Sequence, residues 1–471
     1  MDARSRVSRR AACQALSAGL AGLGGVSGGL SARPVRAANE KLQVACVGVG
    51  GIADLDVTRI ASHPAVQIVG LCDVDANRFA KADAKLPGVR HFADYREMFA
   101  ALGAGFDAVI VDTPDHMHAP VTVAALAARK HVYCQKPISH TVWEARQMRL
   151  WAEHAGVTTQ MGAQIHSSAE YRLGVRLLRD GAIGKVQAVH SWAGVGGNDR
   201  TRLFAPPAAA PLPRHVAWDL WIGAAPMRDY APAYHPYAWR DWQDFGGGAL
   251  GDFGCHILDP VFTALELGAP LTVKARNSGV NDQVWPTQQT VDYVFPGTAH
   301  TAGETLPVTW TDGGLKPRHS LARMPGDADL PSAGSLFIGE QGCLVLPHVG
   351  RPRLYPVERY AGFVMPEVAA RDHWHDWVDA CLSGGTTTAG FHHAGPLTEA
   401  VHLGNIATRL WRPGLDPVSG RLDERAPVLE WDTATLRFRN SPAADRLVTK
   451  AYRPGFEVPA GPPAAGGSPP G

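Results

Sequence analysis

The sequence has little cysteine and no excess of charge of either sign. Its seven cysteines are spread over 471 residues without a Cys-x-x-Cys pair or the spacing of a zinc site. The 45 basic and 44 acidic side chains leave a formal net charge of +1, so no overall field attracts nucleic acid or anionic lipid. These absences argue against a disulfide framework, a metal site and a nucleic-acid partner.

A firmly apolar run of membrane-spanning length is also missing. The most extended candidate, residues 11–30, is rich in glycine and alanine, whereas a membrane anchor needs about 20 strongly apolar residues. It follows the basic pair Arg9-Arg10 and precedes a candidate cleavage site at Val35-Arg36-Ala37. Residues 1–38 therefore resemble a twin-arginine export signal, which predicts a periplasmic or otherwise exported protein without stable membrane insertion. The alternative is a disordered basic leader.

The remaining length exceeds one ordinary core, so two domains are expected. Residues 42–49 form a short apolar run that predicts a buried strand. A Gly-x-Gly-x-x-Ala pattern follows, in which Gly48 would make the tight turn and Gly50 would let a pyrophosphate approach. A second strand, 66–72, ends in Asp73, about 20 residues beyond the glycines, where a ribose hydroxyl is bound in dinucleotide folds. An acid there favours NAD over NADP.

Further apolar runs end in polar groups. Residues 107–112 predict a strand that leads into Thr113, Pro114 and His116, and residues 131–134 predict one that leads into Gln135 and Lys136. The carboxyl ends of parallel strands hold the ligand in such sheets. Lys136 is held on a stiff turn before a proline, so it is a better catalytic candidate than an ordinary surface lysine.

A last Rossmann strand is expected at 157–161. Gln164 and His166 follow it, and they either reach the cofactor or substrate or only bind the loop around them.

Residues 246–259 (GGGALGDFGCHILD) place Asp252 and His256 four positions apart behind three glycines. On a helix these two side chains share one face, and such a pair is a common acid–base arrangement.

The preceding segment, 218–245, is the most aromatic part of the chain. Its aromatic faces either pack against sugar C–H surfaces or only fix the loop to the sheet. Its position before the glycines favours Tyr234, His235, Trp239 and Arg240 near the pocket.

Later residues carry fewer chemical groups. Strands are expected at 291–295, 307–310, 335–338 and 343–346, and helices at 372–381 and 396–410. His373 and His375 lack a third ligand at metal-site spacing, so we interpret 372–381 as a surface helix. Residues 441–471 form a C-terminal tail that should be disordered from about residue 460.

The ordered set of motifs resembles the Gfo/Idh/MocA oxidoreductases. It comprises the glycine pattern, Asp73, TPDHMH (113–118), QKP (135–137), the 246–259 stretch and GPLTE (395–399). The resemblance implies an α/β fold with an N-terminal Rossmann doubly wound parallel sheet, here 39–162. It also implies a C-terminal α/β domain, here 163–440, whose large open mixed or antiparallel sheet often mediates homo-oligomerisation.

The resemblance also implies an activity and a site. Such proteins oxidise or reduce sugars, cyclitols and polyols with NAD or NADP, and Lys136, Asp252 and His256 match their catalytic lysine, aspartate and histidine. The family commonly has glutamate where this chain has Gln135. Some relatives instead retain NAD and cleave glycosides by transient sugar oxidation and elimination, which is the alternative function.

The expected cofactor-binding residues are Gly48, Gly50, Gly51, Ile52, Asp73, Thr113, Pro114, His116, Gln135, Lys136 and Gln164. The expected substrate-binding residues are Tyr234, His235, Trp239, Arg240, Asp252 and His256.

Overall fold

The computed structural model describes residues 41–326, 328–411, 414–415, 422–423 and 426–462. The expected export signal therefore lies outside the described residues, as does most of the segment expected to be disordered. The chain from Lys41 onward forms one unit. Among the described helices, none is long and apolar enough to cross a membrane. The six cysteines within the described ranges are buried and not joined by disulfides.

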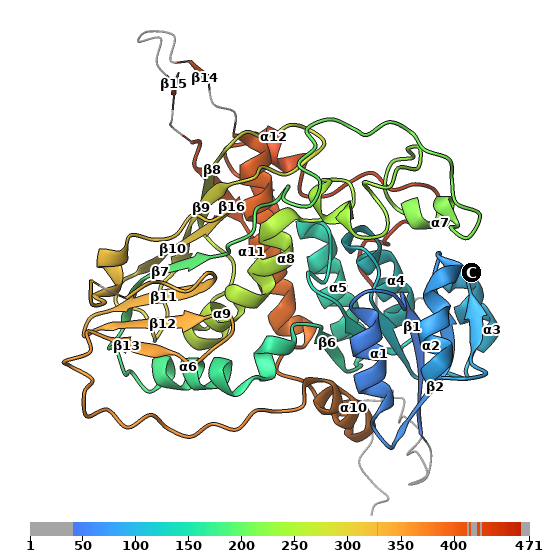
Figure 1. The fold of residues 1–471 in the computed structure, drawn as a ribbon, viewed down its shortest axis with the longest axis horizontal. Helices are drawn as coiled ribbons and strands as arrows, with labels where there is room; N and C mark the ends of the chain where they lie inside the picture. The colour runs from blue at the N-terminus through green and yellow to red at the C-terminus, as the bar shows by residue number, and fades with distance from the viewer. Residues whose placement is uncertain (1–40, 327, 412–413, 416–421, 424–425, 463–471) are drawn as a thin grey trace, which may run out of the picture. The chain divides into compact units, whose positions relative to one another are not determined.

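A six-stranded parallel sheet has the order β3-β2-β1-β4-β5-β6 (Figure 1). The order reverses between β1 and β4, and ligands bind at such a switch point in open α/β sheets. Its strands are β1 (Leu42–Val47), β2 (Val66–Cys72), β3 (Arg90–Phe92), β4 (Ala108–Val111), β5 (His131–Cys134) and β6 (Thr159–Met161).

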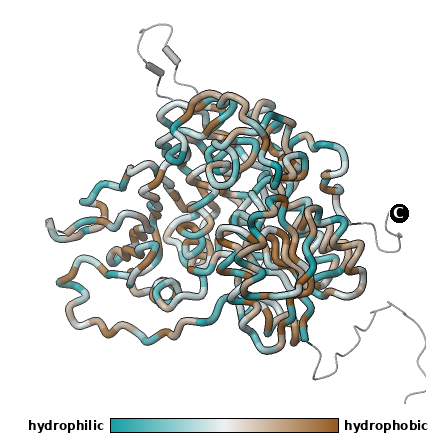
Figure 2. The backbone as a smooth tube through the Cα atoms, turned by 45° about the vertical axis from the view of Figure 1, so that its right-hand side comes forward, coloured by the Kyte–Doolittle hydropathy of each residue, from teal (hydrophilic) through white to brown (hydrophobic). Residues whose placement is uncertain are grey.

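Helices cover both faces of this sheet because its central strands are apolar on both sides. Every residue of β4 and β5 is buried, as expected for a parallel sheet between two helical layers. Figure 2 shows hydrophobic residues concentrated along these strands. One layer contains α3 (Tyr95–Leu102), α4 (Asp115–Ala127) and α5 (Val142–Ala155), and the other contains α1 (Ala53–Ala61), α2 (Phe79–Lys85) and α10 (His373–Ser383).

The helix expected at 372–381 is not a surface helix. It is α10, and its Trp374 and Trp377 side chains pack in the same core cluster as α1 and α2. His373 is buried, and both ring nitrogens have partners: Nδ1 meets Ser167 Oγ at 3.0 Å and Nε2 meets the Met161 carbonyl oxygen at 3.1 Å. Burial lowers the pKa of His373 to about 3.

The second sheet has nine strands in the order β13-β12-β11-β7-β10-β9-β8-β16-β17. It is mixed, because β7 pairs in parallel with β10 and the other neighbours are antiparallel. The strands are β7 (Val186–Trp192), β8 (Thr272–Asn277), β9 (Gln289–Pro296), β10 (Thr305–Asp312), β11 (Gly334–Gly339), β12 (Cys343–Pro347), β13 (Arg353–Tyr355), β16 (Leu429–Asp432) and β17 (Arg437–Phe438). The expected fold class is confirmed.

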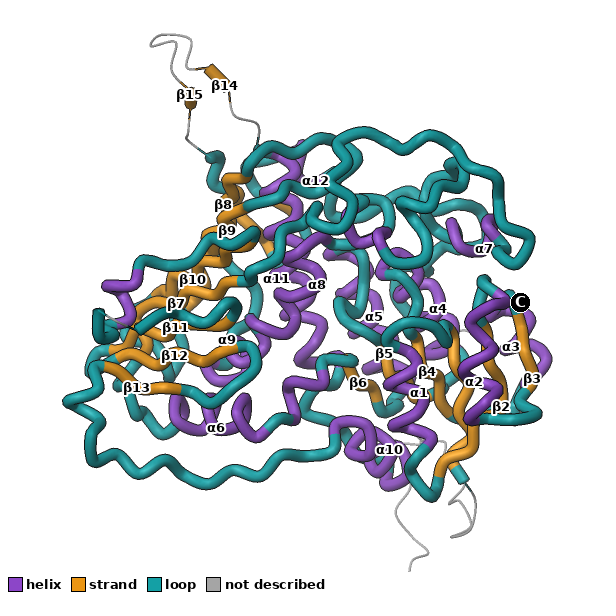
Figure 3. Tube along the Cα trace, viewed as in Figure 1, coloured by secondary structure: helices purple, strands orange, loops and turns teal. Residues whose placement is uncertain are grey.

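Helices pack on one face of this sheet (Figure 3). They bury the inward residues of β9, which alternate with half-buried residues along the strand. These helices are α6 (Ala169–Arg179), α8 (Gly248–Ile257), α9 (Asp259–Leu265) and α11 (Phe391–Leu410). The shorter elements are η1 (Ala76–Arg78), η2 (Gln164–Ser167), α7 (Trp218–Ile222), η3 (Ala238–Asp241), η4 (His319–Ala322), β14 (Gly414–Leu415), β15 (Leu422–Asp423) and α12 (Pro442–Asp445).

Candidate active site

A cavity of about 520 Å³ lies at the carboxyl ends of the parallel strands. Residues of the glycine loop and of the strand ends line it on one side, and residues of the 218–245 segment line it on the other. The predicted residues that line it are Gly48, Gly50, Gly51, Ile52, Asp73, Thr113, Pro114, Gln135, Lys136, His235, Trp239 and Arg240. The cavity therefore brings together most of the expected cofactor side and half of the expected substrate side.

The glycine loop can accept a pyrophosphate only because side chains are absent. Gly48 has φ +87°, and a Cβ there would lie 2.5 Å from the Asp112 carbonyl oxygen. Gly51 also has a positive φ, +65°, with open space where its Cβ would be. Backbone with these angles favours glycine, and the open space faces the start of α1, where anions bind. The loop fits a dinucleotide.

Asp73 fixes this loop as well as lining the cavity. The Val49 amide donates to its Oδ2 at 2.9 Å and the Asp75 amide donates to its Oδ1 at 2.9 Å. Burial raises the pKa of Asp73 to about 6, despite these two hydrogen bonds. At neutral pH the carboxylate can accept a hydrogen bond from a ribose hydroxyl.

Three arginines near the Asp73 end of the cavity are each paired with an aspartate. Because an unpaired arginine is what accommodates the 2′-phosphate of NADP, their pairing favours NAD. The pairs are Arg78 with Asp75 at 3.0 Å, Arg96 with Asp94 at 2.6 Å and Arg453 with Asp219 at 2.5 Å.

Lys136, which lines the cavity, forms an ion pair with Asp252, which lies outside the lining; the sequence had instead paired Asp252 with His256. The Lys136 Nζ also donates to the Asp252 carbonyl oxygen at 2.8 Å. Burial alone would raise the pKa of Asp252. The positive charges of Lys136, Arg240 and Arg200 outweigh that effect and hold its pKa well below the usual range. Asp252 is therefore a permanent carboxylate that holds the lysine ammonium in place.

Arg200 is a member of this cluster that sequence reasoning missed. Its guanidinium reaches Asp252 Oδ2 at 2.5 Å and Asp241 Oδ1 at 3.1 Å. The Arg200 side chain is 13% exposed, and Asp241 is fully buried. No motif marks Arg200, because it lies in an irregular loop about 50 residues before its partner Asp252. The neighbouring acid, Asp241, was inside the aromatic segment but was not distinguished there.

His256 lies one turn beyond Asp252 on α8, but within the described part of the chain no hydrogen bond joins the two side chains. Its ring is 5.3 Å from the ring of His348, and its Nδ1 is buried without a hydrogen-bond partner. Burial lowers the pKa of His256 well below its ordinary value, and the nearby Lys136 and His348 lower it further. The imidazole is therefore neutral at physiological pH, and the same surroundings make it a weaker base than a free histidine. It lines a small neighbouring cavity with Ser335 rather than the large one.

Asp115 is a second acid that the sequence analysis passed over, although it stands within the TPDHMH motif. It is buried and lines the cavity, and its Oδ2 accepts the Gly247 amide at 3.0 Å. Burial raises the pKa of Asp115 to about 7, although Arg240 and Lys136 oppose the shift. Asp115 thus connects the start of α4 to the glycine run.

Asp115→Asn is expected to change how stability depends on pH. The folded protein retains a proton on Asp115 that the unfolded chain, with a pKa of about 3.9, releases, so this group costs stability as pH rises towards 7. Asparagine does not titrate, so the variant should gain about 2–3 kcal/mol over the parent between pH 5 and pH 8. Denaturant unfolding at both pH values measures this, with the exposed Asp379→Asn as control. Equal pH dependence in Asp115→Asn and the parent would contradict it.

Gln135, the departure from the family pattern, has a local reason. Its Nε2 donates to Asp56 Oδ2 at 2.6 Å, and Trp374 Nε1 donates to Asp56 Oδ1 at 2.7 Å. Burial raises the pKa of Asp56 to about 6, and Asp112 beside it also has a raised pKa. A glutamate at position 135 would add a third carboxylate to this buried pair. The amide of Gln135 instead supplies a donor to Asp56.

Gln135→Glu is expected to cost about 2–3 kcal/mol of unfolding free energy at pH 8, because a buried carboxylate then faces Asp56. Adding Asp56→Asn should restore most of the loss, since the amide introduced at position 56 can donate to the new carboxylate and still accept from Trp374. The unfolding free energies of both single variants and the double variant form the test. A double variant no more stable than Gln135→Glu would contradict this explanation.

The aromatic segment is divided between cavity and core. Trp239 and Arg240 line the cavity, with the Arg240 guanidinium 4.1 Å from the centre of the Trp239 ring. Tyr234 does not face the cavity. It packs at 4.8 Å from Trp242 and 5.5 Å from Phe245 in a separate aromatic core.

Two expected cofactor residues also lie elsewhere. His116 is fully buried, its Nε2 is 3.0 Å from the Trp221 carbonyl oxygen and its Nδ1 is 3.4 Å from that of Phe245. Burial lowers the pKa of His116 to about 3, so it is a neutral connector between α4 and the aromatic segment. Gln164, in η2, is outside the lining of the large cavity.

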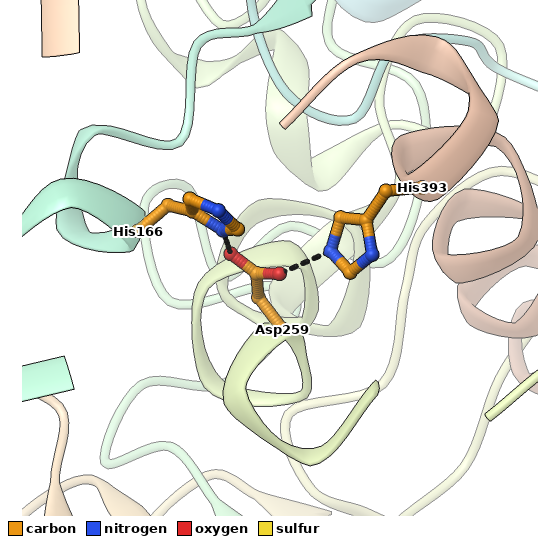
Figure 4. Close-up of side chains that lie close together, drawn as sticks. All are labelled: His166, Asp259 and His393. Carbon is orange, nitrogen blue, oxygen red and sulfur yellow. Dashed lines mark hydrogen bonds and ion pairs between the residues drawn. The ribbon is translucent and has the colours of Figure 1, made fainter. Parts of the chain in front are cut away.

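His166 belongs to a buried cluster with Asp259 and His393 (Figure 4). Its Nδ1 meets Asp259 Oδ2 at 2.8 Å, and His393 Nε2 meets Asp259 Oδ1 at 2.5 Å. His166 Nε2 also meets Thr388 Oγ1 at 3.0 Å. Asp259 is fully buried, and although burial raises its pKa, the two histidines hold it well below the usual range. The cluster joins η2, α9 and α11 through hydrogen bonds. Of the two roles expected for His166, this arrangement corresponds to binding the surrounding chain rather than the cofactor or substrate.

Two family models match the chain. Residues 42–163 match the oxidoreductase family with an NAD-binding Rossmann fold, and residues 202–296 match the C-terminal alpha/beta domain of the same family. Residues 42–163 and 202–296 thus each match a domain of the Gfo/Idh/MocA oxidoreductase family. In that family the Rossmann domain is the part that binds NAD.

Curated relatives match over part of their length. Glucose-6-phosphate 3-dehydrogenase of Bacillus subtilis is 23% identical over 48% of this chain and 54% of its own. Inositol 2-dehydrogenase of Arthrobacter sp. is 28% identical over 32% of this chain and 45% of its own. The chain thus spans about half the length, or less, of these relatives.

Solved structures share the fold over more of the chain. The WlbA dehydrogenase of Bordetella pertussis, in complex with NADH and UDP-GlcNAcA, has a TM-score of 0.56 at 17% identity, covering 79% of this chain and 97% of its own. Levoglucosan dehydrogenase, in complex with NADH and levoglucosan, has a TM-score of 0.53 at 17% identity, covering 78% and 97%.

Proposed function

We propose that this protein is an NAD-dependent dehydrogenase that transfers a hydride between a sugar or polyol carbinol and the cofactor. The observation that carries the proposal is that one cavity contains the glycine loop, Asp73 and Lys136 on one side and Trp239 with Arg240 on the other. Cofactor groups and sugar-packing groups thus share one space. The named relatives, which act on inositol, glucose 6-phosphate or levoglucosan, support a sugar-type substrate.

The chain's own residues divide the chemistry as follows. Bound NAD supplies the hydride acceptor. His256, which matches the family's catalytic histidine and lines the small cavity rather than the large one, is assigned as the acceptor of the hydroxyl proton. The Lys136 ammonium stabilises the negative charge that develops on the substrate oxygen, and Asp252 keeps that ammonium oriented. The site therefore contains a base, an electrostatic stabiliser and an orienting carboxylate.

NAD is proposed over NADP because Asp73 is acidic and the arginines around it are paired. A 2′-phosphate would meet the Asp73 carboxylate and would have to displace an aspartate from Arg78 or Arg96. A titration of both reduced cofactors by fluorescence tests this. Tighter binding of NADPH than of NADH would contradict the assignment.

The activity is tested by incubating the purified protein with NAD and a panel of sugars, polyols and aryl glycosides while absorbance near 340 nm is followed. Net formation of NADH supports the dehydrogenase. Release of the aryl group without net NADH would instead show the redox glycosidase, which no observation in the structure favours. Bound cofactor with neither product would refute both activities.

We also propose that the protein is exported by the twin-arginine route and that it forms homo-oligomers through its nine-stranded sheet. Arg9-Arg10 and the weakly apolar stretch after them support export. The sheet supports self-association because α6, α8, α9 and α11 pack on one face and half-buried residues of β9 lie on the other. Fractionation of cells carrying Arg9→Lys/Arg10→Lys tests the first proposal, and light scattering after gel filtration tests the second.

A further inference from the structure

The C-terminal segment 450–458 forms part of the cofactor cavity, although the sequence predicted only a tail there. Phe456 lines the cavity and is 4% exposed. Its ring lies 4.5 Å from the Arg96 guanidinium and 5.7 Å from that of Arg453. An aromatic side chain from the end of the chain is thus held in the wall of a cavity built mainly by the first 140 residues.

Two charged contacts fix the part of this segment that precedes Phe456. Before Phe456, Lys450 Nζ lies 2.9 Å from Glu144 Oε1 on α5. Next to Phe456, Arg453 Nη2 donates to Asp219 Oδ1 at 2.5 Å. The segment is therefore bound to the Rossmann layer and to α7.

The neighbours of Phe456 in the chain, Gly455 and Arg453, contact two further elements beside the cavity. Arg96, which follows the lining residue Tyr95, donates from Nη1 to the Gly455 carbonyl oxygen at 3.0 Å. Asp219 is followed by the lining residue Leu220 on α7. The 450–458 segment consequently bridges α3 and α7 across the Asp73 end of the cavity.

We propose that Phe456 is a cofactor-binding residue and that segment 450–458 retains the adenosine half of the dinucleotide. The proposal rests on the proposed function, because it takes the large cavity as the NAD site. Asp73, the expected ribose acid, places the adenosine half at this end. Neither matched family region, 42–163 or 202–296, includes Phe456, so it is a feature of this chain beyond those two regions.

Retention follows from the position of the ring. Phe456 lines the cavity at this end, so an adenosine half seated there would contact its ring. Truncation of a buried aromatic contact commonly costs tenfold or more in affinity, and such losses appear mainly in the dissociation rate. Phe456→Ala should therefore release NADH at least about tenfold faster, while Phe456→Tyr should stay within about threefold of the parent.

The test is stopped-flow displacement of NADH by excess NAD, followed by fluorescence, on the full-length protein. Because Phe456 is buried and its truncation can disturb folding, Arg453→Ala and Asp219→Ala are measured too. Each of these two substitutions removes the Arg453–Asp219 ion pair, in which the Asp219 side chain is 66% exposed. Each should increase the rate of NADH release about threefold or more. Arg446→Ala, an exposed arginine shortly before the segment, is the matched control and should leave the rate unchanged.

The possible outcomes distinguish the role of segment 450–458 in retaining NADH from the proposed dehydrogenase function. Tight NADH binding by the parent with faster release from the Phe456, Arg453 and Asp219 variants supports it. Tight binding with unchanged release from Arg453→Ala, Asp219→Ala and folded Phe456→Ala overturns it and leaves the dehydrogenase proposal standing. A parent that binds no NADH overturns both.

Discussion

Replacing His256 with alanine is expected to lower the rate of hydride transfer about 10²–10⁴-fold, the usual contribution of a general base. The reason is that its buried, neutral imidazole has an Nδ1 without a partner and lies one turn from Asp252. NADH affinity should stay within about threefold, because His256 does not line the large cavity. Initial rates at saturating sugar and NAD, with a parallel fluorescence titration of NADH, measure the two quantities.

His348→Ala is the matched control for this experiment. It removes the imidazole 5.3 Å from His256 without removing the proposed base, so the rate should change less than about tenfold. If His348→Ala were as inactive as His256→Ala, the base would be wrongly assigned. Loss of NADH binding in His256→Ala would equally contradict its role.

Replacing Lys136 with methionine is expected to lower the rate about 10²–10³-fold, the cost of removing one electrostatic stabiliser of a developing negative charge. The aliphatic length is kept, and Asp252 retains Arg200 and Arg240 as partners, so the fold should survive. Arginine should not restore the activity, because its planar fork cannot reproduce the point charge of an ammonium. The measurement is again the initial rate at saturating substrates.

Lys130→Met serves as the control for Lys136. It removes a lysine just before β5, at the opposite end of the same strand, where Lys130 Nζ donates to the Phe106 carbonyl oxygen at 2.6 Å. Its activity should stay near that of the parent. Activity in Lys136→Met within threefold of the parent would show that another group stabilises the charge.

The sequence was informative wherever local pattern and function coincide. The strands at 66–72 and 131–134 have the predicted bounds, because short apolar runs between turn residues leave little choice of structure. Lys136 was found because a strand end identifies the ligand edge of a parallel sheet. Asp252 was found because it stands four positions before His256 in the glycine-rich stretch, which places both on one face of a helix.

Long-range packing accounts for what the sequence could not show. β8 reads TVKARN and β16 reads LEWD, too polar or too short to be distinguished from loop until their neighbours in the sheet are known. Arg200 and Phe456 reach the site only through tertiary contacts. Tyr234 failed as a substrate candidate because an aromatic run gives no indication of which rings face a core.

Helix α10 has a consequence for the order in which the molecule is made. The face of the Rossmann sheet that carries α1 and α2 is closed by Trp374 and Trp377, which leave the ribosome more than 200 residues after the last strand of that sheet. The first domain therefore cannot finish its core while the second is being synthesised, contrary to the usual N-terminal-first sequence of events. A fragment ending near residue 162 should aggregate through this bare face, and the cofactor site should become complete only in the full-length chain.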